Sequence, residues 1–318
     1  MVNNRQPEYD LKQSFLRGEF SREEFWTQIN ATLNEVRKLQ HLLHDDAASL
    51  EITEKNLVIN YEILKKHRIK LEIPKNDLRT ASFTVLANGN YESLLENTIF
   101  ELSSKSKKFL DIGANMGFYA LGAALVNREL EVLAFEPNPG IRRSLIENTI
   151  LNQIENRIKI LEYALSDFTG EATFTVPSFT GSGGGSLKNL HPEEGSPNQF
   201  QVIVERLDNL RAETIGTDLV KIDVEGAEFH LLKGGVETIN EEHPTIIVEL
   251  LRKWMKPFES KPQDVVDLLV KMNYVCFAVG DISMRQIATI DESTKETNFI
   301  FCYTGNTRHM KALSNGFE

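Results

Sequence analysis

The chain has 318 residues, 41% of them hydrophobic, and its 46 acidic and 35 basic residues give a formal net charge of −11. Such a length suits one large α/β domain with an appendage, or two domains, and the acidic balance without a concentrated basic stripe argues against nucleic acid as the main partner. No apolar run approaches the roughly 18 residues of a membrane span, and the first residues lack the apolar region of a signal peptide, so we expect a cytoplasmic protein that does not engage membranes.

The first eighty residues differ in pattern from the rest of the chain. Ser21 with Glu24 three residues later forms a capping-box pattern, and apolar residues then recur at near-helical spacing as far as Leu43. A second helix is predicted over about residues 53–67. We therefore predict a helical region at 1–80 ahead of a main domain at 81–318. Three roles stay open for it: packing on that domain, a homodimer interface, or one wall of a substrate pocket.

From residue 109 onward, short apolar runs alternate with helical patterns. The predicted strands are 109–112, 131–135, 157–161, 218–222, 244–250, 274–279 and 298–302, with helices near 116–125, 139–151, 227–233 and 263–272. This alternation predicts a doubly wound sheet, which binds ligands beyond the carboxyl ends of its strands. Two further strands, 171–176 and 201–205, enclose a glycine-rich stretch at 179–187. This β insertion is either a solvated loop or a lid over a substrate.

The segment Phe109-Leu-Asp-Ile-Gly-Ala-Asn-Met-Gly-Phe118 reads as a strand that ends at a glycine turn and opens a helix. Glycine lets backbone N–H groups approach a bound ligand closely, because it has no Cβ. The dinucleotide fingerprint needs G-x-G-x-x-G, and Asn115 stands where its middle glycine belongs. The remaining pattern, D-x-G-x-x-x-G, is typical of sites for S-adenosylmethionine (SAM).

Two polar elements follow the next strands. Glu136 comes directly after strand 131–135, where a carboxylate can accept hydrogen bonds from both ribose hydroxyls of an adenosine; the alternative is a carboxylate that caps a helix. Ser166 and Asp167 follow strand 157–161. They form either a contact with the adenine edge or a simple β-turn.

A third polar element, Lys221-Ile-Asp-Val-Glu-Gly-Ala-Glu228, spans the end of strand 218–222. In an extended strand, Lys221, Asp223 and Glu225 share one face, and three ionisable groups there are costly to bury without partners. We expect them to face one another or a ligand, and Glu249 at the end of the next strand to point into the same crevice. The alternative is a structural ion network in which Lys221 neutralises a carboxylate.

A metal site is a further possibility at this edge. Asp223, Glu225 and Glu249 are hard oxygen ligands that could hold a divalent ion. The chain has no H-x-x-x-H or C-x-x-C spacing, so a metal-independent site is favoured. His230, in the helix after Gly226, is kept as a minor candidate for catalysis.

Taken together, these elements resemble the FkbM family of SAM-dependent methyltransferases. The resemblance runs in order from about residue 91 to 250 and rests on D-I-G-A-N-M-G-F-Y at 111–119, F-E-P-N-P at 135–139, A-L-S-D-F-T-G at 164–170, L-V-K-I-D-V-E-G-A-E at 219–228, L-L-K-G-G at 231–235 and P-T-I-I-V-E-L at 244–250. It implies a class I methyltransferase fold, a Rossmann-like α/β sheet of seven strands with the last antiparallel. It also implies SAM as the methyl donor.

The resemblance further implies roles for individual residues. The turn would hold the methionine part of SAM and Glu136 the ribose, with Ser166 and Asp167 beside the adenine. Asp223 would face the methyl group and orient or deprotonate the acceptor. The turn residues concerned are Asp111, Gly113, Ala114, Asn115 and Gly117.

The family usually methylates a hydroxyl group, so the main expectation is an O-methyltransferase acting on a carbohydrate or another polyhydroxylated or polyketide metabolite, either a small molecule or a glycan. The first alternative is an N-methyltransferase acting on an amide or amine of a modified peptide. The others are a nucleotide-binding protein without turnover, which the intact Asp111, Glu136 and Asp223 weigh against, and a dehydrogenase, which the missing G-x-G-x-x-G weighs against.

Overall fold

The protein is described here by a computed structural model that covers residues 11–39, 43, 48–53, 56–75, 80–178 and 184–314. Contacts divide the chain into two compact units, residues 1–45 and 46–318. The first unit contains α1 (Leu11–Leu16) and α2 (Arg22–Lys38). Its predicted capping box is present, because Ser21 and Glu24 each accept a hydrogen bond from the other's backbone N–H. The homodimer expected through this region stays a prediction.

The second helix predicted at 53–67 is wrong, because this part of the chain forms an antiparallel sheet. Its strands are β1 (Ala48–Ile52), β2 (Leu57–Ile63) and β3 (His67–Ile73). From Ile59 onward, side chains in β2 alternate between buried and more exposed positions, and Ile59, Tyr61 and Ile63 belong to a hydrophobic core of the unit. That period of two is the pattern of a strand with one buried face. The helical character expected of residues 1–80 therefore fails from residue 48 to 73.

The main sheet has eight strands in the order β13-β12-β14-β11-β10-β4-β5-β6. Strands β4, β5, β6, β10 and β11 run parallel, and β14 is antiparallel to its neighbours β11 and β12. The doubly wound α/β fold and the antiparallel last strand are confirmed. The count of seven strands misses β13, which pairs at the edge with β12. The bounds are β4 Lys108–Ile112, β5 Glu131–Phe135, β6 Ile158–Leu161, β10 Leu219–Ile222, β11 Thr245–Glu249, β12 Tyr274–Val279, β13 Met284–Ile287 and β14 Asn298–Tyr303.

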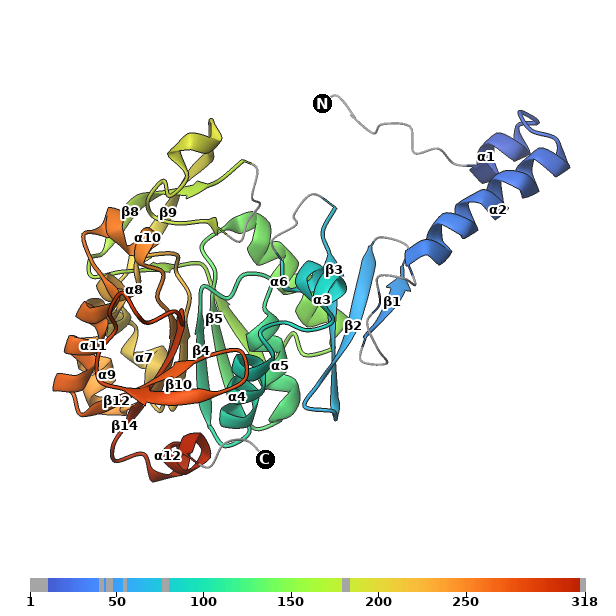
Figure 1. Ribbon diagram of the computed structural model, residues 1–318. Coiled ribbons are helices and arrows are strands. Elements are labelled where there is room, and N and C mark those ends of the chain that lie inside the picture. The colour runs from blue at the N-terminus through green and yellow to red at the C-terminus, as the bar shows by residue number, and fades with distance from the viewer. Residues whose placement is uncertain are drawn as a thin grey trace. The chain divides into compact units, whose positions relative to one another are not determined.

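Helices cover both faces of this sheet (Figure 1). Consecutive strand residues alternate between two cores, so that Phe109 belongs to one core and Leu110 to the other. The first core contains side chains of α4, α5, α6 and the β1–β3 sheet, and the second contains those of α8, α9 and α11. The helices are α3 Ala81–Asn88, α4 Ser93–Ser103, α5 Phe118–Val126, α6 Pro139–Leu151, α7 Arg211–Thr214, α8 Glu228–Gly234, α9 Val236–Glu242, α10 Arg252–Met255, α11 Pro262–Lys271 and α12 Thr307–Ser314.

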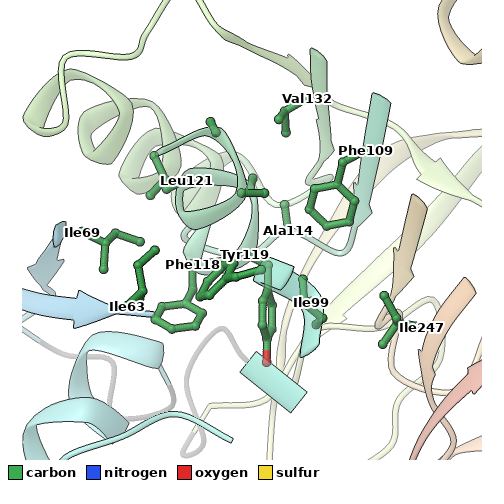
Figure 2. Close-up of a cluster of buried hydrophobic side chains, with 14 of the residues drawn as sticks. Ile63, Ile69, Ile99, Phe109, Ala114, Phe118, Tyr119, Leu121, Val132 and Ile247 are labelled. Carbon is green, nitrogen blue, oxygen red and sulfur yellow. The ribbon is translucent and has the colours of Figure 1, made fainter. Parts of the chain in front are cut away.

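Figure 2 shows how the first core joins the β1–β3 sheet to the glycine-turn helix. Ile63 and Ile69 from β2 and β3 lie beside Phe118 at the start of α5. The outer edge of β3 is also closed by polar contacts, since Asn148 of α6 hydrogen-bonds to its backbone at Glu72, and Asn152, which follows α6, hydrogen-bonds to it at Lys70. These contacts anchor the β1–β3 sheet to α5, which follows the glycine turn, and to α6.

The β insertion is present as predicted. It forms a second small sheet, β7 (Ala164–Leu165), β9 (Asn198–Glu205) and β8 (Gly170–Val176), in that order. Residues 179–183 of the expected lid lie outside the described part of the chain. None of the helices in the described ranges combines the length and hydropathy that a bilayer-spanning helix requires.

Glu96 of α4 carries a pH-dependent part of the stability. It is 2% exposed, accepts a hydrogen bond from the Tyr61 hydroxyl at 3.2 Å, and burial raises its pKa from 4.5 to about 8. Between those two pH values the folded state holds a proton that the unfolded chain has released, so this contribution to stability is complete below pH 4.5 and is lost as pH rises through 8.

In the wild type, the proton that Glu96 holds in the folded state makes the unfolding free energy fall by about 1.4 kcal/mol at most for each pH unit of increase between pH 5 and 8. Glutamine does not titrate, so we expect Glu96→Gln to show a smaller fall in unfolding free energy over this range. Urea unfolding of both proteins across that range measures it. Glu101→Gln, a half-exposed glutamate of the same helix, is the matched control. Parallel pH curves for the wild type and Glu96→Gln would show that Glu96 is not the titrating group.

Candidate active site

The glycine turn between β4 and α5 has the predicted form. Gly113 and Gly117 have φ angles of +81° and +92°, and Asn115 has +51°. The N–H groups of Gly113 and Ala114 both donate to the carbonyl of Phe135, at 3.0 and 2.9 Å. A Cβ on Gly113 would lie 1.8 Å from the carbonyl oxygen of Asp223. Glycine is therefore required at 113 by both the backbone angle and the close approach of β10.

Asp111 lies under this turn with one carboxylate oxygen unused. Its side chain is 1% exposed, and Oδ2 accepts a hydrogen bond from Ala120 N–H at 2.9 Å. Oδ1 is buried without a hydrogen-bond partner among the described residues. Burial raises the pKa of Asp111 to about 6, against the opposing effect of the Lys221 ammonium. A buried acceptor of this kind is costly unless a donor from a bound molecule reaches it.

Glu136 ties the turn to the end of β5. Its Oε2 accepts from Asn115 N–H at 2.9 Å and its Oε1 from Asn138 N–H at 2.8 Å. Burial raises the pKa of this carboxyl to about 7. Each carboxylate oxygen has a second lone pair, so Glu136 can hold the turn and still accept hydrogen bonds from a ligand.

The end of β10 carries an ion pair. Lys221 Nζ lies 3.1 Å from Asp223 Oδ2 and 5.0 Å from the centre of the Tyr119 ring. Burial alone would lower the pKa of Lys221, but the carboxylates of Asp223, Asp111 and Glu92 raise it above its usual value. The expected strand alternation does not extend to Glu225, because β10 ends at Ile222 and Glu225 has a φ of +53°.

Glu249 stands at the end of the neighbouring strand β11. Burial, followed by the negative charges of Asp223 and Glu92, raises the pKa of Glu249 to about 8. Crowding by like charges disfavours its ionised form. Its carboxyl therefore differs from that of Asp223, which the Lys221 ammonium contacts directly.

These groups surround one cavity of about 280 Å³ at the carboxyl edge of the parallel strands, which is the position where such sheets bind ligands. Nine of the twelve candidate site residues line it, and aromatic side chains and the insertion complete its walls. The candidates are Asp111, Gly113, Ala114, Asn115, Glu136, Lys221, Asp223, Glu225 and Glu249, and the other lining residues include Tyr91, Tyr119, Tyr163, Phe174, Leu187 and Trp254.

Three candidates, Gly117, Ser166 and Asp167, are absent from the cavity lining. Gly117 leaves room for Leu145, since a Cβ there would lie 2.2 Å from that side chain. The carboxylate of Asp167 contacts His230 Nδ1 at 3.0 Å and Lys233 Nζ at 2.7 Å. These residues hold the 166–167 turn against α8, while Tyr163, Ala164 and Leu165 line the cavity next to it.

Several lining residues were not singled out from the sequence. Tyr91 comes from the loop before α4 and Trp254 from the short helix α10, and the local sequence of neither carries a catalytic pattern. Tyr119 follows the glycine motif directly, and its place at the start of α5 could have flagged it. The insertion contributes through Ser186, whose hydroxyl donates to the Glu225 carbonyl at 2.8 Å. That bond holds Gly185 and Leu187 in the cavity wall, so the described part of the expected lid contacts the site.

The described residues contain no group of three or more His, Cys, Asp or Glu side chains arranged to hold a metal ion. The carboxylates of the cavity are instead distributed between the glycine turn and the ends of β5, β10 and β11. The metal-independent site expected from the sequence stays a prediction.

Comparison with known proteins gives the family. The model of the methyltransferase FkbM domain matches residues 111–276, more than half of the chain. The methyltransferase sdnD of Sordaria araneosa is 27% identical over 207 residues, covering 54% of this chain and 76% of that protein. The hexuronic acid methyltransferase AglP of Haloferax volcanii is 27% identical over 152 residues, covering 48% of this chain and 59% of that protein.

Among solved structures, a crystal structure of an FkbM methyltransferase from Methylobacillus flagellatus KT is similar, with 17% identity and a TM-score of 0.40. The match covers 62% of this chain and 44% of that one. The family-model match begins at Asp111 of the glycine turn and continues through β10 and β11, which carry the other carboxylates. The chain belongs to the FkbM methyltransferase family.

Proposed function

We propose that this protein is a SAM-dependent O-methyltransferase whose acceptor is a hydroxyl group of a carbohydrate or similar polyhydroxylated molecule. The observation that carries the proposal is the cavity itself. The glycine turn with Asp111 and Glu136 forms one side of it, and the carboxyl groups of Asp223 and Glu249 form another. A donor site and an acceptor site thus share one enclosed space.

The residues of the turn fit SAM. The unpartnered, buried Oδ1 of Asp111 suits the α-ammonium group of the methionine part, and the spare lone pairs of Glu136 suit two ribose hydroxyls. The positive φ angles at Gly113 and Gly117 let the backbone pass close under the cavity without a Cβ at either position. When bound, SAM supplies a methyl group on a positively charged sulfur, which is already a good electrophile.

The chain's own residues then have two tasks, to orient the acceptor hydroxyl and to take its proton. Lys221 contacts the Asp223 carboxylate at 3.1 Å and orients it, so Asp223 is suited to accept a hydrogen bond from the hydroxyl and to stabilise the charge that shifts during transfer. The raised pKa of Glu249, about 8, makes this carboxyl the better base near neutral pH once it is ionised. The relative from Haloferax volcanii, a hexuronic acid methyltransferase, supports a carbohydrate acceptor.

The experiment that tests the function uses methyl-labelled SAM. The protein is incubated with an extract of its host, and the labelled product is identified by mass and fragmentation. A methyl ether on a hydroxylated product is expected. A methyl group on nitrogen would replace the proposal with the N-methyltransferase alternative. If calorimetric titration shows no binding of SAM, the proposal that the protein is a SAM-dependent enzyme fails.

Glu136→Ala should weaken SAM binding by about 10- to 100-fold, because hydrogen bonds to a charged group are each worth roughly 1.5–3 kcal/mol. Calorimetric titration measures this. Glu131→Ala, at the exposed opposite end of the same strand, is the matched control and should bind SAM normally. Equal affinity in both variants would contradict the ribose assignment.

A further inference from the structure

A second concave site, which we call the Glu92 groove, lies next to the active-site cavity. It encloses about 650 Å³ and is lined by residues of 90–95, 279–281 and 295–298. These segments are the loop before α4 with the first turn of that helix, the end of β12, and the approach to β14. The groove is larger than the 280 Å³ cavity that holds the candidate catalytic groups.

The cavity and the groove are lined by residues that are consecutive in the chain or paired across two neighbouring strands. Tyr91 lines the cavity and Glu92 lines the groove. Glu249 lines the cavity, and its register partner across the β11–β14 pair, Asn298, lines the groove. The Tyr119 hydroxyl, in the cavity wall, donates to Glu92 Oε2 at 2.6 Å. The two spaces are therefore neighbours on either side of Glu92 and the β11–β14 pair.

The chemistry of the groove is polar and suited to hydroxyl groups. Amides from Asn90 and Asn298 and hydroxyls from Ser93 and Thr297 line it, and each can both donate and accept. Glu296 adds little net charge, because Arg285 contacts it through two nitrogens, at 2.9 and 3.1 Å. The lining also includes the apolar side chains of Leu94, Leu95 and Val279. A chain of sugar rings would find alternating donors and acceptors here together with apolar surface.

Glu92 has an unusual backbone for its position. Its φ is +53° at the residue that caps α4, a conformation that costs a non-glycine residue about 1–2 kcal/mol. Such strain persists only where the surroundings hold it. The hydrogen bond from the Tyr119 hydroxyl helps to fix Glu92 from the cavity side. The shape of the groove is therefore linked to the shape of the active site.

We propose that the Glu92 groove binds the part of the acceptor beyond the methylated hydroxyl, so that the acceptor is an oligosaccharide or glycan chain and not a single sugar. The inference rests on the proposed O-methyltransferase function and adds a length requirement to it. One ring of the acceptor occupies the cavity beside Asp223 and Glu249, and the next rings lie across Glu92 in the groove.

The test measures how affinity depends on chain length. The full chain is loaded with S-adenosylhomocysteine and titrated calorimetrically with β-linked glucose, α-linked glucose and β-linked N-acetylglucosamine series of one to four units. For at least one series, affinity should rise by about tenfold or more from one unit to three. A flat profile in every series, or binding of none of them, would overturn the proposal.

Blocking the groove provides the second arm. Ser93→Trp fills it from the first residue of α4, and Ser104→Trp at the opposite end of the same helix is the matched control, since both serines are exposed. Ser93→Trp should erase the gain with length while leaving single-unit and SAM affinities unchanged. Asn90→Trp is a second block at another exposed residue of the groove and should behave the same way.

If neither block changes the length dependence, the groove is not the subsite and the proposal fails. The O-methyltransferase function is judged separately, by SAM titration and by the labelled product from host extract. A labelled methyl ether on a single-ring metabolite would therefore preserve that function while rejecting the glycan-chain acceptor.

Discussion

Replacing Asp223 with alanine is expected to lower turnover by about 10²- to 10³-fold, the usual cost of removing one group that hydrogen-bonds the reacting atoms. SAM affinity should stay within a few-fold, because Asp111 and Glu136, not Asp223, are placed to hold the cofactor. Asp223 faces the cavity paired with Lys221 at 3.1 Å. Single-turnover rates with labelled SAM and calorimetric titration measure the two quantities.

The conservative variant Asp223→Asn separates the possible roles of this carboxylate. An amide oxygen can still accept a hydrogen bond from the acceptor hydroxyl, but it cannot take its proton. If Asp223 only orients the acceptor, Asp223→Asn should recover part of the activity lost in Asp223→Ala and keep the same pH dependence. Full activity in either variant would remove Asp223 from the mechanism, and a parallel loss of SAM affinity would assign it to the cofactor site.

The second large effect is expected at Gly113. Alanine there would place a Cβ 1.8 Å from the carbonyl oxygen of Asp223, at a φ of +81°. The positive φ alone costs about 1–2 kcal/mol, and forcing β4 and β10 apart adds a cost of about 1–3 kcal/mol or more. Because the displaced atom is the backbone of Asp223, the same variant should also lose activity.

The chain offers a closely matched control. Gly216 has a φ of +82° with no atom within 4 Å of an added Cβ, so Gly216→Ala carries the backbone cost without the collision. Urea unfolding should show Gly113→Ala to be destabilised by at least about 2 kcal/mol more than Gly216→Ala. Equal destabilisation would mean that the two strands separate at little cost and that the glycine serves the turn alone.

Local patterns in the sequence were sufficient for the parallel sheet. Strand β5 (Glu131–Phe135) and helix α6 (Pro139–Leu151) have the predicted bounds, and the Asn138 side chain caps α6 by accepting from Gly140 N–H. These elements are bounded by residues with strong local effects, such as proline at the first helical position and glycine at a left-handed turn. The order of motifs was likewise enough to indicate the family.

Local patterns predicted the wrong element where the spacing of apolar residues fitted both a helix and a strand. Over Leu57–Ile63 the apolar residues fit a strand, yet Ile59 and Ile63 are also spaced as on one helix face. Pairing with β1 and β3 decided in favour of the strand. The place of Ser166 and Asp167 beside the cofactor stays a prediction, and the contacts of Asp167 with His230 and Lys233, which direct its carboxylate to α8, are visible only in the tertiary structure.

The sequence by itself determined the sheet, the glycine turn and the carboxylates at the strand ends, because each depends on residues near one another in the chain. Only the tertiary structure decided what encloses them. Tyr91 and Glu92 reach the active-site region from the loop before α4, and Trp254 reaches it from α10. Ser186 brings the insertion to Glu225. Those positions depend on how separate elements pack, so no local spacing reveals them. The same packing forms the Glu92 groove, on which the choice of acceptor is proposed to depend.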